Sequence, residues 1–567
     1  MKALELAVRR AFAVPVAAVR PYLVFKLTLL LLAFDLWITR VSHAGRYGAG
    51  GFNVAHWPWL DWVQPEISPP MYIGACVFTA ALCFAIVFAD RPPRWLIGLA
   101  FLVHTWSWAM SMLDSYQHHY LLSIVLFCMI FFPPMSAEEA LRLDASKPDE
   151  PDPATEKPTE NASAPKASAK TARSGKKRKK KAPLVEGEAK ATPPRKGSAL
   201  TGPWPSVSAW SYVLLSGSAA IVYAYTAFSK TDPEWLSGAS LRQVIHYPPP
   251  DVVPGETANV VVRGFHAIIE ALGDDGPLFW FLMGHSVVLV QIVISSGYLL
   301  APFRDVTRSL GTRIFYWVAL FTALSFHFGA ELMGLEIGWF SYYMIAYALI
   351  MFLPVELLVP IARAVLWPKG ERYGLEGVVV RAGVALETGA LGWWLDEPIL
   401  LGASVLIAAG SFVRFFTRAT WTTSLEKLPE AAPLATSAIA ALLLAAVGWA
   451  ADLPGAREAA ILGAVLLGAG VVAALVRNGH ARALHGYAIG TLLGALALAV
   501  SIQASDMRWD YWRNVGGDHR RRGEIEEAYV AYVKANRYAP PDDDRRDEEQ
   551  QMRRILEQRG VLPREGE

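Results

Sequence analysis

The stretch Tyr223–Leu241, YAYTAFSKTDPEWLSGASL, ends an apolar segment that begins at Trp210 and is long enough to cross a bilayer. Lys230 stands at the end of this segment. The polar turn Asp232–Gly238 after it carries Trp235, an aromatic residue of the kind that anchors at a membrane surface. A lysine in this place is either an interface anchor whose amine reaches water or, because burial favours the neutral amine, a base.

The composition around this stretch is that of a membrane protein. The chain has 567 residues, of which 53% are hydrophobic and only 18% charged, and it contains 20 tryptophans. Cys76, Cys83 and Cys128 all lie in apolar runs, which predicts buried packing residues and no disulfide or metal site. The first apolar run, Leu27–Ile38, has no small-residue cleavage site behind it, so we expect an uncleaved first span.

Apolar segments recur along the chain and predict an all-α, polytopic membrane protein with about 12–13 transmembrane helices. The span near 376–395 is the most polar, because it holds Arg381 and Glu387. Basic residues concentrate in the N-terminus and the 135–205 loop, which the positive-inside bias places in the cytoplasm. The C-terminus then lies outside if the segment near 376–395 crosses the membrane, and inside if that segment is only a re-entrant or interfacial helix. The predicted spans are near residues 22–39, 71–89, 95–113, 119–134, 209–229, 277–300, 314–330, 339–366, 376–395, 399–416, 433–451, 459–476 and 485–503.

Two parts of the chain read differently from these spans. Residues 144–200 are rich in Ala, Pro, Lys, Glu and Ser, which predicts a disordered loop. Its run Lys176–Lys181 either attracts anionic lipid headgroups or only fixes topology. Residues Trp512–Pro540 resemble a single tetratricopeptide repeat, and the alternative is an amphipathic helical tail. The predicted parts are transmembrane helices at 1–143 and 201–370, the loop at 144–200, additional transmembrane helices at 371–505 and a helical tail at 506–567.

The predicted topology brings several basic side chains to one face of the membrane. His118 and His119 open the fourth span and Lys230 ends the fifth, so all three lie at the outer side of the membrane. His327, near the end of the seventh span, lies at the same side. An imidazole can hydrogen-bond a neutral amine, and desolvation lowers the pKa of a lysine. Such a base could deprotonate a phenol or quinol that arrives from the bilayer. The alternative is that the histidines are interface residues hydrogen-bonded to water.

Three stretches in this region resemble the vitamin K-dependent γ-glutamyl carboxylase / HTTM family, over about residues 20–365 of the chain. They are SYQHHYLLSIVLFCMIFFP, VYAYTAFSKTDPEWLSGASL and FHFGAELMGLEIGWFSYYMIAYALIMFLP. The resemblance implies that Lys230 deprotonates reduced vitamin K or menaquinol. Oxygenation then makes a strong base that removes a γ-proton from glutamate, and CO2 adds. His119 falls on the histidine that supports the lysine, and His118 stands where the carboxylase has asparagine. The motifs mark His327, Trp235 and Asp232 as supporting residues.

The chain also departs from this family, which leaves three hypotheses. Further apolar stretches and the tail stand where the carboxylase has a large luminal domain. The first hypothesis is a quinol-dependent enzyme of the carboxylase or epoxidase type. The second is a non-catalytic scaffold or maturation factor, whose tail binds a protein partner. The third is a transporter, which the charges at Arg381 and Glu387 suggest. The expected partners are the lipid bilayer and a protein at the tail, and no nucleic acid.

Overall fold

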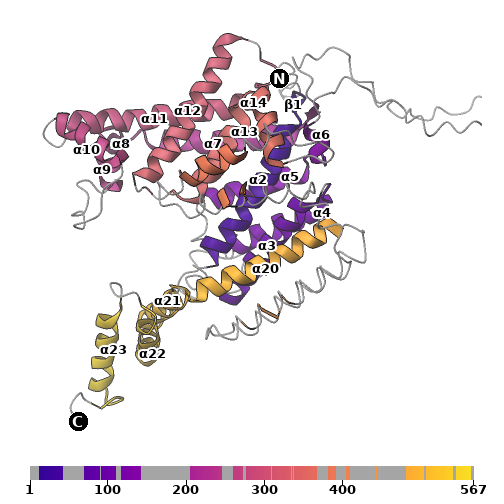
Figure 1. The fold of residues 1–567 in the computed structure, drawn as a ribbon. Coiled ribbons are helices and arrows are strands. Elements are labelled where there is room, and N and C mark those ends of the chain that lie inside the picture. Colours follow the sequence, from indigo (N-terminus) through magenta and orange to yellow (C-terminus); the bar gives the residue numbers. More distant parts are fainter. Residues whose placement is uncertain are drawn as a thin grey trace, which may run out of the picture.

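The computed structural model is built almost entirely of helices (Figure 1), and the predicted all-α, polytopic membrane class is confirmed. Among the described residues, four helices are long and apolar enough to cross a membrane, and a bent pair makes a fifth. The predicted loop at 144–200 lies outside the described residues, as do almost all of the predicted spans between 399 and 476. The described residues are 12–41, 69–89, 91–109, 117–141, 205–245, 260–272, 276–307, 309–333, 335, 337–366, 381–390, 481–503, 506–539 and 544–563, with isolated positions between 404 and 446.

The N-terminal helices form one bundle. They are apolar on most faces, as expected of helices that are covered by protein on one side and lipid on the other. At its C-terminal end α2 passes into a π-helical turn, η1 (Leu36–Arg40), in which Val41 N donates to Leu36 O. Such turns are rare and are found frequently at functional sites. The helices are α2 (Val19–Asp35), α3 (Pro69–Phe88), α4 (Arg94–Ala109), α5 (Gln117–Ile130) and the short α6 (Ala137–Leu141).

A second group of helices packs against the first through α7 (Trp210–Ser229), which contacts both α5 and α11 (Pro277–Leu300). It continues with α12 (Leu310–Leu332) and α13 (Trp339–Phe352). A short antiparallel pair of strands, β1 (Pro15–Ala17) and β2 (Ser206–Ser208), joins the starts of the two groups.

The span predicted at 339–366 is broken into two helices in the structure. After α13 the chain bends by 119° into α14 (Val355–Leu366). Leu353 is extended, with φ −60° and ψ 144°, because Pro354 follows it and disfavours the helical conformation in the preceding residue. The sequence therefore predicts the helical content of this region correctly and its direction incorrectly.

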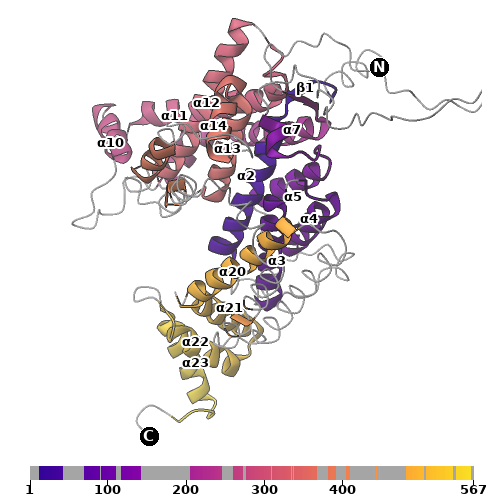
Figure 2. The same cartoon turned by 45° about the vertical axis from the view of Figure 1, so that its right-hand side comes forward.

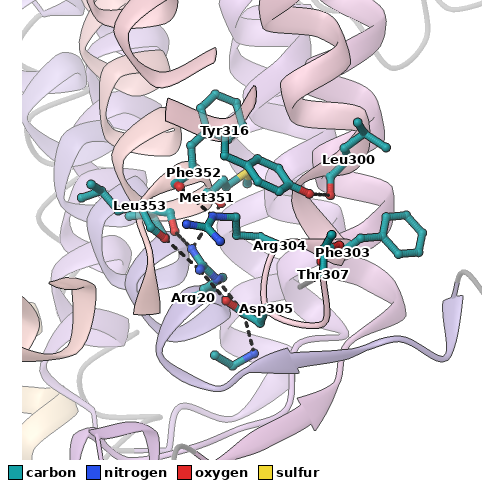
Figure 3. A network of polar contacts seen from close by, with 12 residues as sticks. Arg20, Leu300, Phe303, Arg304, Asp305, Thr307, Tyr316, Met351, Phe352 and Leu353 are labelled. Carbon is teal, nitrogen blue, oxygen red and sulfur yellow. Dashed lines mark hydrogen bonds and ion pairs between the residues drawn. The ribbon is translucent and has the colours of Figure 1, made fainter. Parts of the chain in front are cut away.

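The break leaves backbone carbonyls at the end of α13 without helical partners, and buried arginines bind them (Figure 3). Arg20 donates to the carbonyls of Ile350, Met351 (3.2 Å) and Leu353 (2.9 Å). Arg304 donates to the carbonyl of Phe352 at 3.0 Å. The charge of Arg20 is balanced by Asp305, at 2.6 and 2.8 Å. We call Arg20, Arg304, Asp305 and these carbonyls the inner network.

The last long helix, α20 (Ala481–Gln503), returns to pack against α3, as both cartoon views show (Figures 1 and 2). Three glycines at four-residue spacing, Gly486, Gly490 and Gly494, face the N-terminal bundle. A Cβ at Gly486 would lie 2.6 Å from Phe84 O, and one at Gly490 would lie 2.9 Å from Ala81 Cα. Small residues at this spacing let two membrane helices approach closely.

Two smaller units project from the membrane bundle. The C-terminal tail consists of α21 (Asp506–Arg522), α22 (Ile525–Asn536) and α23 (Arg546–Gln558). Helices α22 and α23 share a core that includes Ala528, Tyr532, Met552 and Leu556. The second unit comprises α8 (Pro233–Leu236), α9 (Ala239–Val244) and α10 (Val260–Leu272), which lie beside the start of α11 (Figure 1). We call these three helices the rim platform.

Candidate functional site

Lys230 directly follows the last residue of α7 and lies between the bundle and the rim platform. Its amine donates to Thr226 O at 3.4 Å and lies 5.1 Å from the centre of the Trp235 ring. The hydrogen bond is long for an ammonium donor, so the charge has little compensation. The side chain is half-buried, and this burial lowers the pKa of Lys230 below its usual range.

The surface next to Lys230 is apolar and open. Phe228 is 77% exposed and Tyr225 is 69% exposed, both on the last two turns of α7. In a membrane protein such side chains face lipid, so the amine stands at the border between lipid and water. A lipid-borne molecule could reach Lys230 from this side.

Asp232 and Trp235 form one structural device. Asp232 Oδ1 accepts from Trp235 N at 3.0 Å and caps α8, and Pro233 occupies the first helical position. The cap fixes the turn so that the Trp235 ring lies beside the amine of Lys230. Asp232 therefore acts on Lys230 through the conformation of the turn.

His118 and His119 both bind Arg40, a residue that the sequence analysis did not single out. Arg40 Nη2 lies 3.2 Å from His118 Nε2 and 3.1 Å from His119 Nδ1. A guanidinium has donors only, so both of these ring nitrogens accept. The remaining nitrogen of His119, Nε2, must then carry the proton. The π-helical turn η1 ends at Arg40 and brings it to the start of α5.

That proton on His119 has no acceptor among the residues that the structure describes. His119 is only 2% exposed, and its Nε2 is buried without a hydrogen-bond partner. His104 on α4 is buried as deeply, and its ring lies 6.3 Å from that of His119. A buried donor without a partner costs free energy, so this cluster is suited to an oxygen acceptor. His104 had no signal in the sequence beyond its place in an apolar run.

His327 belongs to a third, separate cluster. Tyr223 OH lies within hydrogen-bond distance of His327 Nε2, and His327 Nδ1 lies 3.2 Å from Ser341 Oγ. The three side chains are buried and join α7, α12 and α13. Tyr223 stands two helical turns before Lys230, so the hydrogen bonds among Tyr223, His327 and Ser341 fix the helix that carries the amine. Neither Tyr223 nor Ser341 is recognisable as a partner of His327 from the sequence.

The helices that carry His119 and Lys230 pack against each other in opposite directions, and the structure does not join the two side chains. The rings of Phe131, just after α5, and Trp210, at the start of α7, lie 5.1 Å apart, so the two helices run antiparallel. Because α5 has 14 residues and α7 has 20, α7 extends beyond the start of α5, and Lys230 lies past His119 along the pair. Within the described part of the chain, the amine of Lys230 contacts Thr226 and Trp235, whereas the ring of His119 contacts Arg40, His118 and His104. The expected support of the amine by His119 is therefore not a direct hydrogen bond in this conformation.

The described residues hold no group of three or more His, Cys, Asp or Glu side chains that could bind a metal ion. No protein-family model, curated protein or solved structure matches this chain. The geometry above is therefore the basis for any statement about function.

Proposed function

We propose that this protein is a membrane enzyme in which Lys230 is the base toward a lipid-borne phenol or quinol, at the non-cytosolic rim. The reaction is of the carboxylase or epoxidase type, and it uses a reduced quinone such as vitamin K or menaquinol, O2 and CO2. The observation that carries the proposal is the half-buried amine of Lys230, which has one long hydrogen bond and borders exposed apolar side chains.

The lowered pKa of Lys230 supports the role of base. Burial raises the fraction of neutral amine at a given pH, and only the neutral amine can accept a proton. An interface anchor has the opposite requirement, because it is favoured when its ammonium group is fully hydrated. The same site geometry supports an approach of the substrate from the lipid, past Phe228 and Tyr225.

His119 has a complementary role in this proposal. Its Nε2–H, fixed by the contact of Nδ1 with Arg40, donates to an oxygen of the bound substrate. Donors aimed at an oxygen that gains negative charge stabilise the deprotonated form. When bound, the reduced quinone supplies the electrons that reduce O2. His118 holds the same Nη2 of Arg40, and His327 supports the helix that carries Lys230.

The experiment is an epoxide assay on the purified protein in detergent, with reduced menaquinone or vitamin K, O2 and CO2. We expect the wild type to form epoxide and Lys230→Ala to form none. Ser229→Ala changes the neighbouring exposed residue and should keep the activity of the wild type. Absence of epoxide from the wild type, or full activity of Lys230→Ala, would contradict the proposal.

One observation favours a second function, that of a scaffold whose tail binds a protein. Helices α22 and α23 share a hydrophobic cluster. Gly516 of α21 lets Tyr532 pack closely, because a Cβ at position 516 would lie 2.9 Å from the Tyr532 ring. This unit would then present a partner-binding surface outside the membrane bundle. Deletion of residues 506–567 separates the two functions: an enzyme keeps epoxide formation, whereas a scaffold loses its cellular role.

A further inference from the structure

The turn that carries Trp235 lies directly on α11, at a contact between two glycines. A Cβ at Gly284 would lie 2.2 Å from the carbonyl oxygen of Trp235 and 2.9 Å from that of Leu236. A Cβ at Gly238 would lie 2.2 Å from the carbonyl oxygen of Trp280. Real side chains do not approach this closely, so neither position accepts even alanine without movement of the backbone.

The two glycines have separate reasons to be glycine. Gly238 has φ +82°, a conformation that side chains disfavour, and it reverses the chain between α8 and α9. Gly284 is an interior residue of the first third of α11, where its helix does not require glycine. Trp280 and Gly284 are one helical turn apart and therefore face the same side. Glycine at position 284 is therefore explained by the close contact between α11 and the Trp235–Gly238 turn.

We propose that Gly284 is a positioning residue for Lys230: its missing side chain lets the Trp235–Gly238 turn dock on α11 and holds the Trp235 ring beside the amine. The inference rests on the proposed function, in which Lys230 is the base. It adds that the environment of this base is set by a membrane helix, α11, and by the contact at position 284.

The apolar contacts of the rim platform act in the same direction. Leu241, Ile269, Phe279 and Trp280 form a buried cluster, and Trp235 packs against it. Trp235 thus packs against this cluster and also lies beside the amine of Lys230. If the turn lifts from α11, Trp235 moves with it, and the amine loses the cover that lowers its pKa.

Another glycine of α11 offers a matched control. A Cβ at Gly297 would lie 2.8 Å from Ala319 Cβ and 3.0 Å from Phe352 Cζ, so Gly297→Ala causes a similar collision on the same helix. Its neighbours belong to α12 and α13 and are not in contact with Lys230. A general loss of helix packing would affect both variants, whereas a change in the environment of Lys230 should appear in only one.

The test is the pH dependence of acetylation of Lys230 by acetic anhydride, followed by mass spectrometry on the full-length protein in detergent. We expect Gly284→Ala to move the midpoint to higher pH by about one unit, the usual spread of lysine pKa values in proteins, because the amine becomes more exposed. Gly297→Ala should keep the midpoint of the wild type. Trp235→Leu removes the ring without a backbone collision and should shift the midpoint in the same direction.

An unchanged midpoint in folded Gly284→Ala, or an equal shift in Gly297→Ala, would overturn the inference. If Gly284→Ala does not fold, Trp235→Leu decides, and an unchanged midpoint there overturns it. The readout is independent of epoxide formation. A shifted midpoint together with an active Lys230→Ala protein would therefore reject the proposed function and keep the positioning role. An unchanged midpoint together with an inactive Lys230→Ala protein would reject the positioning role and keep the proposed function.

Discussion

The inner network and the Lys230 site both place a basic side chain at the end of an apolar helix, but they differ in how its charge is compensated. Arg20 is fully buried and binds a carboxylate and three backbone carbonyls. Lys230 is half-buried and has one long hydrogen bond and an aromatic ring. A guanidinium whose donors are all hydrogen-bonded, such as that of Arg20, satisfies the carbonyls at a helix end and does not readily give up a proton. A poorly compensated amine is less favourable for stability and available for chemistry.

The largest expected effect breaks the inner network. Asp305→Asn leaves the guanidinium of Arg20 buried without its counter-charge, because both side chains are almost inaccessible to solvent. Removal of one partner of a buried ion pair costs about 3–5 kcal/mol. We expect a large fall in the thermal unfolding midpoint in detergent. Stability equal to that of the wild type would show that Arg20 is not buried as described.

A smaller loss of stability is expected when the buried hydrogen bond between Tyr223 and His327 is removed. Tyr223→Phe removes the hydroxyl that binds His327 Nε2 and leaves a buried ring nitrogen unpartnered. An unsatisfied buried polar group costs about 1–3 kcal/mol. Chemical unfolding should show this loss, and Tyr225→Phe, on an exposed part of the same helix, provides the control. Equal stabilities of the two variants would argue against the hydrogen bond.

The inner network should also give the protein a specific sensitivity to acid. Burial alone would raise the pKa of Asp305, but the charge and hydrogen bonds of Arg20 outweigh it, and the pKa is lowered. The ionised group therefore stabilises the fold above its ordinary pKa of about 4, and this contribution is lost as the pH falls through the lowered value. Unfolding midpoints measured across acid pH should fall less steeply in Asp305→Asn than in the wild type.

The smallest effect on stability is expected at Lys230 itself. Lys230→Met removes an amine whose contacts are weak and partly exposed, so the free energy of unfolding should change by only about 0.5 kcal/mol. Because burial lowers the pKa of Lys230, any gain from this change should be largest at low pH and should shrink as the pH rises through that pKa. A large loss of stability would mark Lys230 as a structural residue like Arg20.

The sequence predicts the helices of this protein better than their contacts. The apolar runs near 22–39, 209–229, 277–300 and 314–330 each coincide with a long apolar helix. Their length and composition are local properties, which periodicity and hydropathy can reveal. The bend at Pro354 has a local signal as well, since a proline marks it, but the arginines that bind the freed carbonyls come from distant parts of the chain.

The partners of the candidate site residues depend on contacts distant in sequence and could not be predicted. Arg40 meets His119 across 79 residues, and Tyr223 meets His327 across 104. The contact of Gly284 with the Trp235 turn is likewise set by tertiary packing. Lys230 was recognisable because its signal is local: an amine at the end of a span, followed by a turn with a tryptophan.

Epoxide formation by Lys230→Arg, compared with the wild type at the same pH, distinguishes a base at position 230 from a cation that only anchors the helix. Arginine keeps the positive charge and the anchoring contacts with lipid and Trp235, but it does not give up its proton in proteins. We expect Lys230→Arg to be stably folded and to form no epoxide. Wild-type activity in Lys230→Arg would contradict this expectation, because position 230 would then require only a cation.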